Sequence, residues 1–111
     1  MREETLMELR IYAVSVELVR ELRGIVGLIE RKDRDLGNQL RRAASSVVLN
    51  LGEGMYSRGG LRPARYQTAL GSAREVAACL EVAGAWGYIP RVDEKVAGKL
   101  RQVIGTLVRL T

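Results

Sequence analysis

The sequence predicts an all-α protein that folds as an antiparallel, up-down-up-down four-helix bundle. Apolar residues recur at spacings of three and four along four segments, and short breaks separate these segments. No segment alternates apolar and polar residues for long, and no Asn-Gly or Asp-Gly hairpin turn occurs. The 111 residues, of which 47% are hydrophobic, are enough for one core. Residues 1–111 are therefore expected to form a single domain in which short connections join antiparallel neighbours.

The first helix is expected from about Glu3 to Ile29, with acids in its first turn and bases after its end. In the polar break that follows, Asp33 or Asp35 is available as N-cap for a second helix, from about Leu36 to Tyr56. The predicted core faces are Leu6, Leu9, Ala13, Val16, Val19, Leu22, Val26 and Ile29 in the first helix, and Leu36, Leu40, Ala43, Val47 and Leu51 in the second.

The third helix is expected from about Arg62 to Trp86, with Pro63 in its first turn. Gly87 is a natural stop for it, and Pro90 is expected to open the fourth helix. The predicted core faces are Tyr66, Ala69, Ala73, Val76, Ala77, Leu80 and Ala83 in the third helix, and Val92, Val96, Leu100, Val103, Leu107 and Leu110 in the fourth.

Three of the glycines inside the predicted helices lie on or beside the central helix contacts and need a reason, because each costs about 1 kcal/mol of helix propensity relative to alanine. A close helix contact at Gly71, and by the same logic at Gly52 and Gly54, would offset this cost. For Gly54 the alternative is fraying, since it lies within a turn of the predicted helix end.

A polar stripe follows the apolar face of each central helix. The second helix carries Gln39, Arg42, Ser46, Asn50, Glu53 and Ser57, and the third carries Thr68, Ser72, Glu75 and Cys79. In antiparallel neighbours these stripes would meet, with an arginine such as Arg42 or Arg58 to neutralise the acids. We therefore predict a structural polar network of Gln39, Asn50, Glu53, Ser72 and Glu75.

Basic residues are concentrated in the middle of the chain. Residues 36–80 contain six arginines and no lysine against two glutamates, whereas the whole chain has a formal net charge of +5. Arginine binds phosphate through its planar, bidentate guanidinium, although a merely solvated basic surface gives the same composition. The candidate phosphate contacts are Arg41, Arg42, Arg58, Arg62 and Arg65.

Catalysis is not expected. The chain has no histidine, the usual general base and a frequent metal ligand, so the serines lack an activator and no metal or cofactor is predicted. Glu53 and Glu75 on facing helices are assigned to ion pairing. The lone Cys79 is interpreted as packing, and with no signal-peptide or membrane-spanning run in evidence, a cytoplasmic protein is expected.

The few aromatic residues leave alternatives open. Tyr56 and Tyr66 bracket the arginine-containing loop and could stack on unpaired bases, but we favour Tyr66 in the core. Trp86 and Tyr88 are expected to cover the bundle end or a subunit contact.

The runs QLRRAASSVVLNLGEG, ALGSAREV and GYIP resemble the bacterial four-helix-bundle proteins of the 23S rRNA intervening-sequence type over nearly the whole chain. This chain departs from the family pattern in having Gly52 where alanine is usual and Arg65-Tyr66 where an aromatic pair is frequent. The matching positions are Gln39, Arg41, Arg42, Asn50, Glu53, Gly54, Arg58, Gly71, Ser72 and Glu75.

The resemblance implies a ring-shaped homopentamer. It also implies kinship with accessory proteins of diversity-generating retroelements, which bind nucleic acid and a reverse transcriptase. We accordingly expect a non-enzymatic, oligomeric nucleic-acid-binding protein, with RNA favoured over DNA. The alternative is a protein-interaction scaffold, such as a reverse-transcriptase accessory subunit, without a direct role in nucleic-acid binding.

Overall fold

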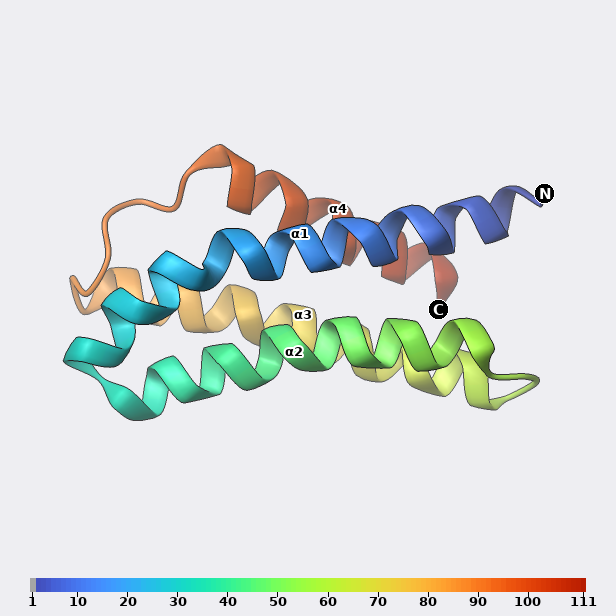
Figure 1. Cartoon of the computed structure of the whole chain (residues 1–111), viewed down its shortest axis with the longest axis horizontal. Coiled ribbons are helices and arrows are strands. Elements are labelled where there is room, and N and C mark those ends of the chain that lie inside the picture. The colour runs from blue at the N-terminus through green and yellow to red at the C-terminus, as the bar shows by residue number, and fades with distance from the viewer. Residues whose placement is uncertain (1) are drawn as a thin grey trace.

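The computed structural model describes residues 2–111 as four helices, and no strand occurs in this part of the chain. The helices are α1 (Glu3–Lys32), α2 (Arg34–Tyr56), α3 (Leu61–Ala85) and α4 (Glu94–Leu110). The molecule measures 44 × 24 × 18 Å, and α1 contacts α2 and α4 while α3 contacts the same two helices. The all-α fold and the bundle packing are thus confirmed. In Figure 1 the chain turns back at each connection, and α1 and α2 lie nearest the viewer.

The junction of α1 and α2 is a single residue. Asp33 has an extended backbone, its N–H donates to Ile29 O at 2.7 Å, and its carboxylate accepts from the backbone N–H of Leu36 at 3.0 Å. The predicted N-cap at Asp33 is confirmed, and it allows α1 to continue three residues beyond Ile29 and α2 to begin at Arg34.

The start of α4 was predicted wrongly. Pro90 lies in the connection, and α4 begins only at Glu94, where the Asp93 carboxylate accepts from the Val96 N–H at 3.1 Å. A side-chain acceptor satisfies one of the free N–H groups of the first turn, which a proline at the same place cannot do.

The core confirms the predicted faces of α2, α3 and α4 in most positions, but the α1 face is displaced. Leu6 and Leu9 are exposed. The buried stripe of α1 includes the polar residues Glu8 and Ser15, which a search for apolar periodicity does not detect. Ser15 satisfies its hydroxyl locally by donating to Tyr12 O at 2.7 Å. The buried residues of α1 are Glu8, Ile11, Ser15, Leu18, Leu22, Val26 and Ile29.

Only part of the glycine prediction holds. A Cβ on Gly54 would lie 2.7 Å from Tyr66 Cδ1, and one on Gly52 would lie 3.3 Å from Tyr12 Cε1, so both glycines admit an aromatic ring against α2. Gly54 is buried and does not fray. The close contact predicted at Gly71 is wrong, because nothing lies within 4 Å of a Cβ built there.

Candidate nucleic-acid interface

Arg62 lies at the point where α2 ends and α3 begins, and its guanidinium is turned inward. Its Nη1 lies 3.3 Å from Glu8 Oε1, its Nε donates to Ser57 O at 3.3 Å, and its Nη2 donates to Met55 O at 3.1 Å. Glu8 is only 3% exposed. One arginine therefore neutralises a buried carboxylate of α1 and satisfies carbonyls at the C-terminal end of α2, so the structure places this predicted phosphate contact in an internal ion pair.

Tyr66 packs beside this pair and is fully buried, which confirms the core alternative for its ring. Its hydroxyl has no hydrogen-bond partner within residues 2–111. Burial, together with the negative charge of Glu8, raises the pKa of the Tyr66 phenol well above its ordinary value. Glu8, Arg62 and Tyr66 form a polar cluster within the core, which we call the Arg62 cluster.

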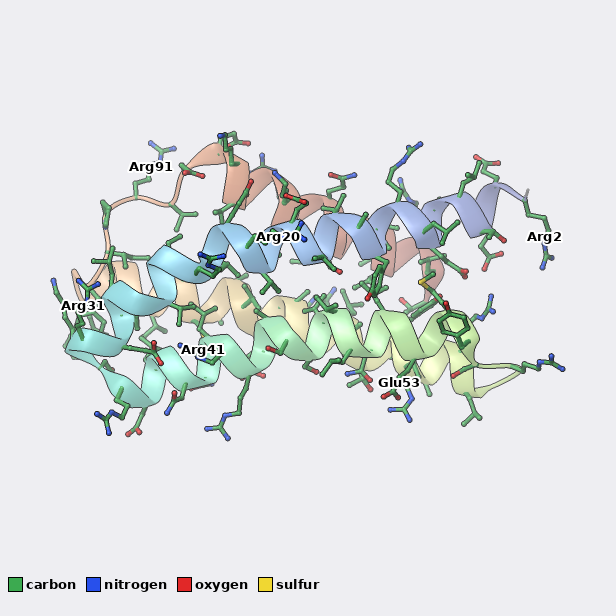
Figure 2. All side chains as sticks on the ribbon, in the orientation of Figure 1. Arg2, Arg20, Arg31, Arg41, Glu53 and Arg91 are labelled. Carbon is green, nitrogen blue, oxygen red and sulfur yellow. The ribbon has the colours of Figure 1, made fainter. Side chains whose placement is uncertain are left out.

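The other four candidate arginines are exposed. Arg41 pairs with Glu30 at 2.7 Å and Arg65 pairs with Glu53 at 3.0 Å, and in both pairs the arginine side chain is about half exposed or more, at 60% and 49%. Figure 2 labels Arg41 and Glu53 along α2. Such exposed pairs contribute ~0–1 kcal/mol, so a phosphate can replace the carboxylate at little cost. Within residues 2–111, Arg42 and Arg58 form no ion pair.

The predicted polar network is only partly assembled. Ser46 Oγ and Ser72 Oγ are 2.8 Å apart across α2 and α3, and Asn50 Nδ2 donates to the carbonyl and hydroxyl oxygens of Ser46 at 2.9 and 3.0 Å. Glu53 instead turns to Arg65. Gln39 and Glu75 are exposed and line an open depression of about 430 Å³ together with Asp35 and Arg42.

An apolar groove between α1 and α2 is the largest feature that the sequence patterns missed. At the Tyr56 end its volume is about 610 Å³, and it continues toward Val19 as a shallower depression of about 290 Å³. Leu49 is 65% exposed and Tyr56 is 88% exposed. The signal was the unbroken run Val47-Val48-Leu49, which is too wide for one buried stripe. We call this feature the α1/α2 groove; its lining includes Tyr12, Val16, Val19, Val48, Leu49, Gly52, Met55 and Tyr56.

Neither a cluster of metal ligands nor an activated thiol occurs among the described residues. No group of three or more potential metal ligands among His, Cys, Asp and Glu occurs within residues 2–111. Cys79 is buried, as expected for packing, and its burial with the nearby charge of Glu75 raises the pKa of its thiol, which disfavours the nucleophilic thiolate. Exposed guanidiniums suit a polyanion, and an exposed apolar groove suits a macromolecular partner.

None of the helices in the described part of the chain is long and apolar enough to cross a membrane. Comparison with curated proteins and with solved structures gave no match. The sequence does match a protein family, described as 23S rRNA-intervening sequence protein, over residues 7–109.

Proposed function

Because the chain belongs to the 23S rRNA-intervening sequence protein family, we propose that it is a non-enzymatic, cytoplasmic, homo-oligomeric protein that binds nucleic acid, RNA in preference to DNA. Its scaffold is the antiparallel, up-down-up-down bundle. The observation that carries the proposal is the exposure of Arg42 and Arg58 without an ion pair within residues 2–111. Together with Arg41 and Arg65 they make up the exposed arginines of α2, the α2–α3 connection and α3 that we call the arginine surface.

The proposal assigns two roles to the five candidate arginines. Those of the arginine surface meet phosphates, two of them by exchanging an exposed carboxylate for a phosphate oxygen. Arg62 supports them from inside, because it ties the residues that precede Arg58 to α1 and α3. No residue reads base edges in this arrangement, so recognition rests on charge and shape.

Assembly would multiply this surface. The α1/α2 groove leaves large apolar side chains exposed, and a second copy of the chain packed on it would remove them from water, at ~25 cal/mol per Å² of apolar area. We propose that the assembly is a closed pentameric ring. In such a ring each exposed arginine recurs once per subunit. The summed charge attracts a polyanion far more strongly than one subunit does.

The test is charge reversal at the two unpaired arginines. The variant with Arg42→Glu and Arg58→Glu is compared with wild-type protein for binding to a fluorescein-labelled RNA hairpin at fixed salt. We expect a loss of affinity of tenfold or more. Lys95→Glu with Arg101→Glu in α4 is the matched control, because it changes the net charge equally and lies away from the arginine surface, on a helix that packs on α1 and α3. Equal binding by the double variant would refute the proposal.

The second candidate is a protein-interaction scaffold, including a reverse-transcriptase accessory subunit. The α1/α2 groove favours it, since an amphipathic helix of a partner fits an apolar groove between two helices. The same double variant separates the two candidates. Retained RNA binding, or no RNA binding by wild-type protein, turns the assignment toward the scaffold.

A further inference from the structure

One end of the bundle combines an exposed tryptophan, which stacks on a partly buried tyrosine, with cations that the sequence patterns did not single out. The α1–α2 junction and the connection after α3 lie together at the left of Figure 1. Tyr88 is partly buried against the core, and this burial together with the negative charge of the Asp33 carboxylate raises the pKa of its phenol. Ile89 is buried in the core and anchors the connection from inside.

The backbone holds the aromatic pair in a fixed position. Gly87 has φ +76°, the Tyr88 N–H donates to Ala83 O at 2.9 Å, and the Gly87 N–H donates to Gly84 O at 3.0 Å. These bonds are the Schellman motif that ends a helix with a left-handed glycine. The rings of Trp86 and Tyr88 stack with centroids 6.4 Å apart and an interplanar angle of 20°. Trp86 remains 69% exposed on this hydrogen-bonded turn.

Four cations lie on the segments that meet at this end of the bundle, at the end of α1, the start of α2 and the connection after α3. Arg31, Lys32, Arg34 and Arg91 are exposed and form no ion pair within residues 2–111. Figure 2 labels two of them, Arg31 at this end of the bundle and Arg91 on the adjoining connection.

The acids of the same segments offset these cations only in part. Asp33, Asp35 and Asp93 bring three negative charges against the four positive charges of the cations, and two of these acids, Asp33 and Asp93, accept from backbone N–H groups as N-caps. A polyanion that also presents a flat ring can stack on the exposed indole and form ion pairs with the unpaired guanidiniums.

We propose that this end of the bundle is a second binding site, at which Trp86 stacks on an unpaired base of single-stranded RNA while Arg31, Lys32, Arg34 and Arg91 hold the flanking phosphates. The inference rests on the proposed function for the kind of ligand, RNA, but its residues are separate from the arginine surface. It predicts that single-stranded segments are bound here by stacking, which tolerates any base.

The chain contains a single tryptophan, so indole fluorescence reports on this site alone. Ten-nucleotide oligoadenylate RNA titrated into wild-type protein is expected to quench that emission saturably, and Arg31→Glu with Arg34→Glu is expected to weaken the quenching at least tenfold. Trp86→Leu should weaken oligoadenylate binding, followed by anisotropy of labelled RNA, by roughly 5- to 100-fold, the effect of one lost base stack. Val108→Ala on α4 trims another exposed apolar side chain outside this site and should leave both signals unchanged.

Two results would overturn the inference. The first is unchanged tryptophan emission when anisotropy shows that oligoadenylate is bound. The second is a blue-shifted indole that acrylamide cannot quench in RNA-free protein, which would place Trp86 in a subunit contact. The variant with Arg42→Glu and Arg58→Glu separates this site from the arginine surface: it should retain saturable quenching even if it loses the hairpin RNA. Loss of quenching in that variant would refute an independent second site.

Discussion

Removing the Arg62 guanidinium is expected to destabilise the whole domain, although the residue lies at a helix start near the surface. Arg62→Ala leaves the Glu8 carboxylate, whose side chain is 4% exposed, without its counter-charge. Loss of one partner of a buried ion pair costs ~3–5 kcal/mol. Since the Arg62 side chain is itself 35% exposed, water reaches part of the vacated space, and the lower end of that range applies. We expect the free energy of unfolding to fall by about 3 kcal/mol.

The assay is urea unfolding followed by far-UV circular dichroism at one fixed protein concentration, so that assembly contributes equally to every sample. Arg65→Ala is the matched control: it breaks the ion pair with Glu53, which is exposed at both ends, and should cost less than about 1 kcal/mol. Replacing Glu8 and Arg62 together by leucine should recover part of the loss, because no unpaired buried charge remains although the Met55 and Ser57 carbonyls still lose their donor. A loss below about 1 kcal/mol for Arg62→Ala, or no recovery in the double variant, would refute the reasoning.

Three further predictions follow from the core and the groove. Gly54→Ala should lower the free energy of unfolding by ~1–3 kcal/mol because the added methyl group meets the Tyr66 ring. Gly71→Ala, whose methyl group enters open space on α3, should raise the free energy of unfolding by up to about 1 kcal/mol. Equal effects of the two changes in thermal unfolding would contradict the packing. Tyr66→Phe removes a buried hydroxyl without a partner and should leave stability at pH 7 unchanged or higher. Because the folded pKa of Tyr66 is raised, the unfolded chain loses this proton first as the pH rises through about 10, so wild-type stability should fall above that pH, and less steeply in Tyr66→Phe; identical pH profiles of urea unfolding would contradict this. Leu49→Lys should reduce the assembly mass measured by light scattering while the helical circular dichroism is kept, and an unchanged mass would exclude the α1/α2 groove as the subunit contact.

The fold class could be predicted from the sequence because four separate segments show the same helical spacing of apolar residues. One misassigned position in a segment therefore changes the prediction little. The α1 face shows where this reasoning fails. Its buried stripe includes Glu8, whose burial depends on Arg62 more than fifty positions away, and no local pattern encodes that partner. The prediction that α4 begins at Pro90 failed for a related reason. The preference of proline for a helix start is weak compared with the N-cap hydrogen bond that Asp93 accepts.

The residue types of the candidate site could be predicted from the sequence, but their arrangement in space could not. Arginine content marked the middle of the chain as basic, yet which guanidinium faces solvent depends on where Glu8, Glu30 and Glu53 lie after folding. Ser46 was likewise predicted to lie in the polar stripe of α2. Only the packed helices show that the Ser46 hydroxyl connects Asn50 to Ser72, and that Glu53 and Glu75 do not.

The salt dependence of RNA binding tests the central claim most directly. For single-stranded RNA, the slope of log affinity against log salt changes by ~0.7 for each phosphate contact, and for a duplex by ~0.9. If Arg42 and Arg58 each neutralise a phosphate, their joint reversal should lower the affinity for the hairpin RNA and reduce the magnitude of the slope by about 1.4–1.8 for every subunit engaged. An affinity and a slope equal to those of wild-type protein would contradict the account.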